Sequence, residues 1–178
     1  MCIRDSITHK PYKGGLHTVD AIELAAGLAL KAVQSGAVIL NLTMAEDLCV
    51  HNGRASGVVA NRTMIGEALP VDPIMLSARA VIDATGHEAA VVERLRRRGL
   101  LSLPGAERLL GEGPLDASSG EAFVIEHVGE VFPGLWVAGM SVCTTFGGPR
   151  MGPIFGGMLL SGKHVAELVR SAFNEKES

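Results

Sequence analysis

The sequence predicts an α/β fold, in which helices pack on a layer of buried strands that carries one antiparallel insertion. Three observations predict it: segments with helical apolar spacing alternate with short apolar runs, Asn52-Gly53 separates two alternating runs, and a tight turn at Gly86 joins a strand to a helix. No GxGxxG pattern follows a strand near residue 1. The sequence therefore predicts either an atypical fold or one whose first half is missing.

The first half predicts a helix, a strand and a hairpin. Residues 18–36 have apolar positions every three or four residues, and the short apolar run 37–42 is typical of a buried parallel strand. Asn52-Gly53 predicts a two-residue hairpin turn, because both positions of that turn need positive φ. The apolar residues with this helical spacing are Val19, Ile22, Ala26, Leu30 and Val33.

The second half predicts a strand at 78–85, a helix at 88–99, a long surface loop at 101–120 and a last buried strand at 133–140. A Gly-rich turn then enters a helix within 148–173, with Pro153 in its first turn. The residues of this helix expected to face inward are Ile154, Met158, Leu159, Val165 and Val169.

Composition narrows the class of protein. With 47% apolar residues and a net charge of −3, the chain can bury one core and lacks the basic surface of a nucleic-acid-binding protein. No apolar stretch reaches the length of a membrane span, and three scattered cysteines suit a reducing cytoplasm. We expect a non-native or disordered start at 1–13, a single α/β domain at 14–173 and a tail at 174–178.

Asp72 and His87 are candidate metal ligands. A carboxylate and an imidazole suit a divalent first-row metal such as Fe(II). Each also has a plain structural explanation, since Asp before Pro begins turns and a Gly-His step can start a helix. Fully extended, the intervening chain would span roughly 50 Å, so a reversal must lie between them if they share an ion. Two ligands leave the shell incomplete, and substrate or cofactor atoms would have to fill it.

Arg150 and Cys143 lie in the segment before the last helix. Arg150 precedes a helix N-terminus, where backbone N–H groups favour anions, and its guanidinium can bind a carboxylate or phosphate bidentately. A Gly-requiring turn with a surface ion pair explains Arg150 equally well. Cys143 is a weak candidate for a nucleophile in a predicted active loop, because no His base is paired with it in the sequence.

Three segments together resemble the C-terminal two-thirds of the thiamine thiazole synthase family. They are "AEDLCVHNGRASGVVAN", "VDPIMLSARAVIDATGHEA" and "GLWVAGMSVCTTFGGPRMGPIFGGMLLSGKHVAEL". The resemblance implies a glutathione-reductase-like, FAD/NAD-binding Rossmann-type fold whose N-terminal βαβ part is missing here. It also implies a ring-shaped homo-oligomer, with an octamer as the expected form, that turns NAD, glycine and a sulfur source into an ADP-linked thiazole carboxylate. NAD is a substrate in this reaction: nicotinamide leaves, and its ribose carbons enter the ring.

The resemblance implies roles for individual residues. Asp72 and His87 would be the Fe(II) ligands, both from one protomer and facing the NAD bound by its neighbour. Arg150 would bind the glycine carboxylate. The residues that would contact NAD are Ala45, Pro70, Val71, Asp72 and Met140.

This sequence departs from the family pattern in two places. Some members carry at the position of Pro70 a Cys that donates its own sulfur, and Pro70 has no sulfur to give. The sequence is closest in pattern to the sulfide-using members, which implies free sulfide as donor and multiple turnovers. The Gly-rich turn that cradles ADP should precede residue 1, so we expect a truncated fragment that does not bind NAD tightly.

Two other functions remain open from the sequence. One is part of an FAD-dependent oxidoreductase, since "GLWVAGM" also occurs in such strands. The other is a non-catalytic nucleotide-binding remnant. No membrane or nucleic-acid partner is expected under any of the three interpretations.

Overall fold

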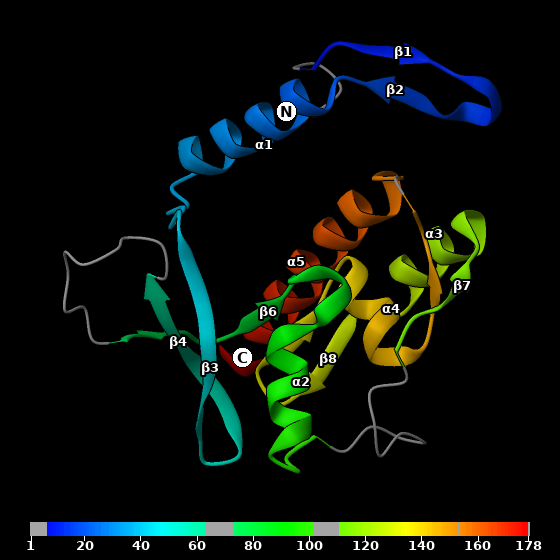
Figure 1. The fold of residues 1–178 in the computed structure, drawn as a ribbon. Coiled ribbons are helices and arrows are strands. Elements are labelled where there is room, and N and C mark those ends of the chain that lie inside the picture. Colours follow the sequence, from blue (N-terminus) through cyan, green and yellow to red (C-terminus); the bar gives the residue numbers. More distant parts are fainter. Residues whose placement is uncertain (1–6, 63–72, 102–110, 153, 178) are drawn as a thin grey trace. The chain divides into compact units, whose positions relative to one another are not determined.

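The computed structural model describes residues 7–62, 73–101, 111–152 and 154–177 (Figure 1). Contacts divide the chain into two compact units, Met1–Leu42 and Thr43–Ser178. No helix among the described residues is both long and apolar enough to cross a membrane.

The first unit is a short hairpin followed by a helix. Its elements are β1 (His9–Pro11), the 3-10 helix η2 (Lys13–Gly15), β2 (His17–Val19) and α1 (Ala21–Gln34). β1 and β2 pair antiparallel, and β1 lies within 1–13, where we expected a non-native or disordered start. α1 begins after Asp20, whose carboxylate accepts hydrogen bonds from the N–H groups of Ile22 and Glu23, both at 2.9 Å.

The predicted helix is confirmed as α1, and its apolar stripe is largely exposed. Ile22, Leu30 and Val33 are 81%, 57% and 54% exposed. Ile7 instead packs close to Gly27 of α1 and is buried. Apolar spacing identifies a stripe on a helix, but it does not say whether a partner covers that stripe.

The prediction of a strand at 37–42 is wrong, because these residues form no strand. Residues 37–40 have no regular structure, and Val38 is 82% exposed. Leu42, with a φ of 55°, ends the first unit. Apolar and β-branched residues favour a strand only where a neighbouring strand can pair with them, and none does so here within the described residues.

The second unit contains two larger sheets, β3-β4-β5 and β6-β9-β8, and a small one, β10-β7. Its strands are β3 (Thr43–His51), β4 (Arg54–Arg62), β5 (Ile74–Ser77), β6 (Val81–Asp83), β7 (Gly113–Leu115), β8 (Gly129–Phe132), β9 (Leu135–Val137) and β10 (Pro149–Arg150). Its helices are η3 (Gly86–Glu88, 3-10), α2 (Ala90–Arg97), α3 (Ala117–Glu126), α4 (Met140–Phe146) and α5 (Gly156–Glu177).

The sheet β3-β4-β5 is the antiparallel insertion that the sequence predicts. Asn52 and Gly53 have φ values of 50° and 71°, which confirms the two-residue turn. The sheet is joined to the rest of the unit by backbone contacts, because the Ala55 N–H donates to the Pro133 carbonyl at 2.8 Å. The insertion is therefore fixed to the turn between β8 and β9.

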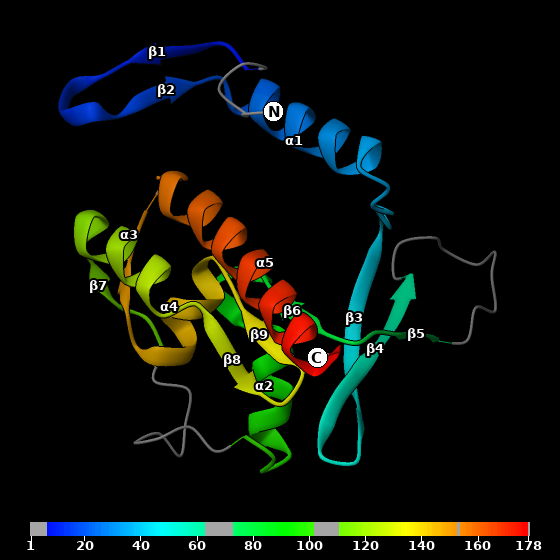
Figure 2. The same cartoon turned by 180° about the vertical axis from the view of Figure 1, so that it is seen from behind.

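The sheet β6-β9-β8 is mixed, because β6 runs parallel to β9 and β8 antiparallel to it. α2 lies over the face turned toward the viewer in Figure 1, and α5 lies over the opposite face in Figure 2. The strands predicted at 78–85 and 133–140 are confirmed as β6 and β9, and the helix predicted at 88–99 as α2. An α/β fold with mixed sheets follows.

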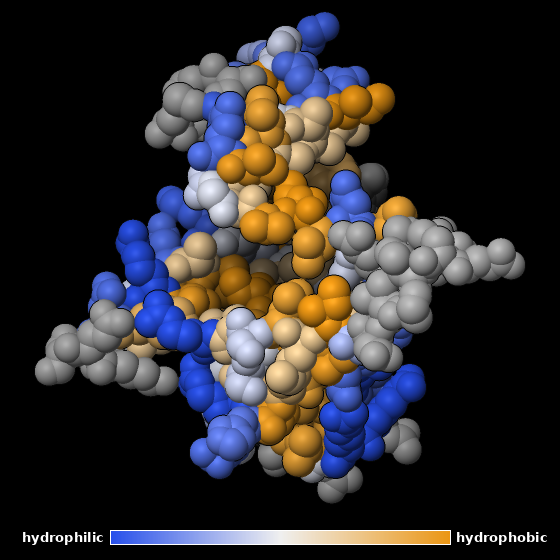
Figure 3. All heavy atoms as spheres, turned by 90° about the vertical axis from the view of Figure 1, so that its left-hand side faces the viewer, coloured by the Kyte–Doolittle hydropathy of each residue, from blue (hydrophilic) through white to orange (hydrophobic). Residues whose placement is uncertain are grey.

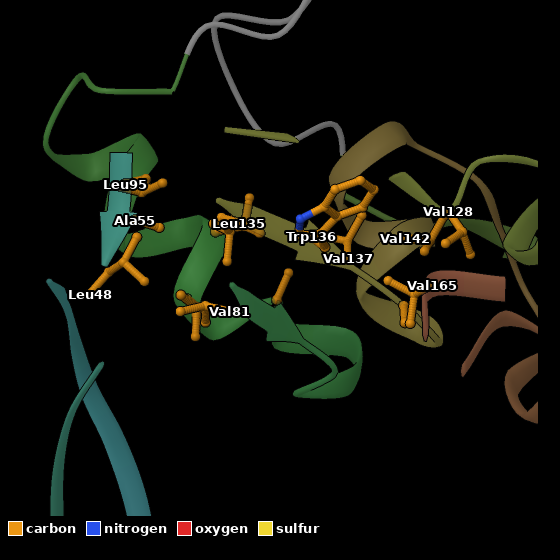
Figure 4. Packing of buried hydrophobic residues seen from close by; sticks show 14 residues of the cluster. Leu48, Ala55, Val81, Leu95, Val128, Leu135, Trp136, Val137, Val142 and Val165 are labelled. Carbon is orange, nitrogen blue, oxygen red and sulfur yellow. The ribbon is translucent and has the colours of Figure 1, made fainter. Parts of the chain in front are cut away.

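The main core lies where these layers meet (Figure 4). β9 contributes buried side chains at all three of its positions, with Leu135 and Val137 fully buried. Leu48 of β3 and Ala55 of β4 belong to the same cluster, so the core joins the insertion to the mixed sheet. Other members shown in Figure 4 are Val81, Leu95, Val128, Trp136, Val142 and Val165.

The prediction of a long loop at 101–120 is wrong for residues 113–120. β7 and the start of α3 occupy 113–120, whereas 102–110 lies outside the described residues. The Asp116 carboxylate caps α3, accepting from the Ser119 N–H at 3.1 Å and from its hydroxyl at 2.7 Å. Ser and Gly have low helix propensity, so local composition hides a helix that packing stabilises.

α5 confirms the last predicted helix but begins later and runs through 174–177, which we expected to be tail. Leu159 is 37% exposed, so its predicted inward position is wrong. Ile154 precedes the helix, and Pro153 lies outside the described residues. The predicted inward residues that are buried or partly buried are Ile154, Met158, Val165 and Val169.

Candidate functional site at the ends of β6 and β9

The parallel strands β6 and β9 end side by side. Asp83 lies opposite Val137 in the register, and the Ala138 N–H donates to the Asp83 carbonyl at 3.1 Å. His87 follows the end of β6, and Met140 follows the end of β9. The carboxyl ends of parallel strands are where α/β sheets commonly bind ligands.

Asp83 organises the turn after β6. Its Oδ2 accepts from the N–H groups of Val91 and Val92, both at 2.9 Å. Its Oδ1 accepts from the Thr85 N–H at 3.0 Å and hydroxyl at 2.7 Å. The side chain has no exposed surface. Asp83 thus takes over the capping of α2, whose own N-cap residue, Ala89, has no capping side chain.

α4 fixes the backbone that carries His87. The Gly86 N–H donates to the Ser141 hydroxyl at 3.1 Å, and the Thr144 hydroxyl donates to the His87 carbonyl at 2.8 Å. Gly86 has a φ of 83°, which an L side chain rarely adopts. The 3-10 turn η3 is therefore held from one side by Asp83 and from the other by α4.

His87 and Arg150 meet at Glu112. The Nδ1 atom of His87 makes a close hydrogen bond with Oε1 of Glu112, and the Nε atom of Arg150 lies 4.0 Å from Oε2. The Glu112 side chain is 15% exposed, whereas those of His87 and Arg150 are 50% and 57% exposed. Two residues singled out from the sequence thus share one largely buried carboxylate.

No local pattern in the sequence singles out Glu112. It lies 25 residues from His87, in a stretch where we expected a loop with little structure. Asp83 was also missed, although an acid at the end of a buried strand, shortly before a helix without an N-cap side chain, is a readable signal.

The remaining predicted site residues do not join this cluster. Pro70, Val71 and Asp72 lie outside the described residues. Ala45 lies in β3 and packs against the main core. Met140 opens α4, is 5% exposed and belongs to a second, smaller apolar cluster.

Cys143 does not lie in an active loop, which corrects that expectation. It is in α4 with no exposed surface. Burial, reinforced by the nearby charge of Glu112, raises the pKa of its thiol to about 11. The thiol therefore stays protonated near neutral pH and is a poor nucleophile.

A carboxylate of the chain itself, that of Glu121, occupies the first turn of α5. The Gly157 N–H donates to Oε1 of Glu121 at 2.8 Å. Arg150 lies in β10 next to this turn in sequence, and the ion-pair partner that the described residues provide for it is Glu112. Any anion that Arg150 binds would thus be held by its guanidinium rather than by this amide.

The described residues hold no group of three or more His, Cys, Asp or Glu side chains that could bind a metal. His87 nevertheless suits a metal ligand, because Glu112 engages only one of its ring nitrogens and half of the side chain is exposed. Metal-binding histidines commonly donate their other ring N–H to a carboxylate in this way.

These features define a class: an α/β protein with mixed sheets and a polar site beyond the ends of two parallel strands. The chain belongs to the Thi4 family, whose model matches residues 4–155. The resemblance drawn from the sequence motifs is thereby confirmed.

Curated relatives and a solved structure agree with this assignment. The chain is 48% identical to a thiamine thiazole synthase of Thermotoga maritima over 85% of this chain and 58% of the relative. It is 49% identical to one of Thermococcus kodakarensis over 85% and 59%. The crystal structure of Thermovibrio ammonificans THI4 matches with a TM-score of 0.87 and 42% identity, over 94% of this chain and 66% of that one. The chain thus spans about three fifths of the length of the curated relatives it matches.

Proposed function

We propose that this chain supplies the metal-binding and glycine-binding residues of a thiamine thiazole synthase. The reaction would convert NAD, glycine and a sulfur source into ADP-thiazole carboxylate. The observation that carries the proposal is the meeting of His87 and Arg150 at Glu112, in a chain of the Thi4 family. A cation ligand and a carboxylate-binding group are the two functions that an iron-dependent reaction of glycine needs at one place.

Each residue has a physical role in this proposal. Asp72 and His87 would hold Fe(II), which when bound supplies a Lewis acid. Arg150 would bind the glycine carboxylate through its guanidinium fork and hold it close to His87. Ala45, Pro70, Val71, Asp72 and Met140 would contact NAD.

We propose free sulfide as the sulfur donor. Pro70 carries no sulfur, and Cys143 is buried and protonated. Cys49 is partly buried in β3, a strand of the antiparallel insertion. A donor from outside the chain would allow many turnovers per subunit.

The fold and assembly form part of the same proposal. The parallel pair β6 and β9 with helices on both faces suits a glutathione-reductase-like dinucleotide-binding fold. Apolar side chains remain exposed on the protein; on β5, for example, Met75 is 67% exposed. Figure 3 shows apolar residues at the surface in orange. Surface of this kind favours a homo-oligomer, with an octamer expected. Free Cys49 and Cys143 suit the cytoplasm.

The test is an anaerobic incubation of the full-length enzyme with NAD, glycine and Fe(II), with and without sulfide. Mass spectrometry measures the ADP-thiazole product per subunit. We expect more than one product per subunit with sulfide and none without it. An equal amount of product per subunit with and without sulfide would contradict the sulfide proposal.

Two variants and one spectrum separate the alternatives. His87→Ala and Arg150→Gln should each abolish product while leaving the circular dichroism spectrum unchanged. A yellow protein with bound flavin and no need for iron would instead favour an FAD-dependent oxidoreductase. A folded protein that gives no product under any condition would favour a non-catalytic remnant.

A further inference from the structure

Glu112 lies between two outward-facing side chains and uses a different oxygen for each. Oε1 contacts Nδ1 of His87, and Oε2 faces Nε of Arg150. An ionised carboxylate can only accept hydrogen bonds, so Nδ1 must carry the imidazole proton. In the neutral imidazole the other nitrogen, Nε2, then carries no proton and presents a lone pair.

The backbone on both sides of Glu112 is fixed. The Gly111 N–H donates to the Thr144 carbonyl at 3.1 Å, and the Gly113 N–H donates to the Gly148 carbonyl at 2.8 Å. The hydroxyl of the same Thr144 donates to the His87 carbonyl. Thr144 of α4 is therefore hydrogen-bonded both to the segment that carries Glu112 and to the turn that carries His87.

Exposure supports an indirect role for Glu112. Its side chain is 15% exposed, and the His87 side chain is 50% exposed. The carboxylate therefore lies beneath the imidazole rather than at the open surface. Its Oε1 is hydrogen-bonded to His87, and its Oε2 lies 4.0 Å from Nε of Arg150.

We propose that Glu112 is a positioning residue that selects the Nδ1–H tautomer of His87 and so presents Nε2 to a metal ion. The tautomer assignment rests on the contacts above. Its consequence for metal binding rests on the proposed function. Carboxylates that orient a ligating histidine typically change metal affinity by about 10–100-fold when they are removed.

The test compares wild-type protein with Glu112→Gln, Glu112→Ala and the matched control Glu88→Gln. Glu88 neighbours His87 and is exposed, so the control removes the same charge nearby. The tautomer is read by 15N NMR of histidine-labelled protein at about pH 9, where histidine is ordinarily neutral. The His87 signal is the one missing from His87→Gln.

We expect Nδ1–H in wild type and in Glu88→Gln, and a shift toward Nε2–H in Glu112→Ala, which removes the acceptor; Glu112→Gln keeps an amide oxygen that can still accept from Nδ1. Nε2–H in wild type, or no shift in folded Glu112→Ala, would overturn the proposal. If the variants fail to fold, the wild-type tautomer alone decides.

A second measurement titrates the same proteins with Co(II) alone. Affinity should fall about 10–100-fold in Glu112→Gln and stay unchanged in Glu88→Gln. An equal affinity in all three proteins would overturn the metal part of the proposal. The NMR result does not depend on product formation, so an inactive protein with the expected tautomer would count against the proposed function and not against Glu112.

Discussion

Asp83 shows how one buried acid can define a site that it does not touch directly. It accepts hydrogen bonds from three backbone N–H groups and two hydroxyls, those of Thr85 and Ser141, while its side chain is inaccessible to solvent. The turn to His87 and the start of α2 both depend on it. Removing this acid should therefore cost far more than removing an exposed helix cap.

We expect Asp83→Ala to lower the free energy of unfolding by at least about 3 kcal/mol, since each buried donor left unpaired costs about 1–3 kcal/mol. The matched control is Asp20→Ala. Asp20 also caps a helix through two N–H groups but is exposed, so about 1 kcal/mol is expected. Urea denaturation measures both. Equal losses in the two variants would contradict the buried network.

The sequence identified His87 and Arg150 as candidate site residues, but not Glu112, which contacts both. His87 and Arg150 were identified because short motifs surround them. Glu112 belongs to no local pattern, and its contact with His87 arises only when α4 brings distant segments together. Cys143 was misplaced for the same reason.

α3 packs closely against β10, the strand that carries Arg150. A Cβ at Gly120 would lie 2.8 Å from the Pro149 carbonyl and 2.9 Å from the Met151 side chain. Gly to Ala inside a helix normally gains about 1 kcal/mol in propensity. Here the clash with backbone should outweigh that gain.

We therefore expect Gly120→Ala to destabilise the protein by about 1–3 kcal/mol. Gly162→Ala is the matched control, because Gly162 lies inside α5 and a methyl group added there would meet nothing within 4 Å among the described residues. It should stabilise by up to about 1 kcal/mol. Thermal and urea unfolding report the difference. Two variants that shift in the same direction would refute the close packing of α3.

α2 carries an acid between two arginines. The Arg96 guanidinium, bonded to Glu93 at 2.6 Å, and that of Arg97 at 2.8 Å together lower the pKa of the Glu93 carboxyl to about 2. Because the folded pKa lies below the ordinary value of 4.5, the pair stabilises the folded state above pH 4.5. That stabilisation is lost as the pH falls toward 2.

Glu93→Gln should therefore lower Tm by a constant amount above about pH 5 and by a shrinking amount below it. Melting curves at several pH values measure the difference from wild type. Glu126→Gln, at an exposed position, should show no such trend. A difference that grows as the pH falls would have the wrong sign for this ion pair.

The sequence predicted elements well where a strong local rule applied. Asn52-Gly53 specified the hairpin, and a short apolar run specified β9. Prediction failed where tertiary contacts decide: α4 has seven residues rich in β-branched and small side chains, which lower its helix propensity. The run at 37–42 has the composition of a strand, but no strand among the described residues pairs with it.

Among the described residues, both units carry large apolar side chains that are exposed. In the first unit Ile22 is 81% exposed, and in the second Met75 is 67% exposed. Burial of apolar surface contributes about 25 cal/mol per Å², which makes such surface costly to leave in water. The proposed self-association would cover it.

We expect sedimentation velocity to show species larger than a monomer, in amounts that rise with protein concentration. Ile22→Glu and Met75→Glu should each reduce the larger species if the corresponding surface is used. Leu48→Ala, in the core, should lower stability without that specific effect. A single monomeric species at all concentrations would count against the oligomer.

The hydrogen bonds of Thr144 also bear on the time course of folding. Its contact with His87 spans 57 residues, and that of Ser141 with Asp83 spans 58. Contacts between such distant positions carry a loop-closure cost, which makes them slow to form. The imidazole of His87 should thus acquire its native environment only when α4 docks, and its NMR signal would report the completion of folding rather than the formation of helices.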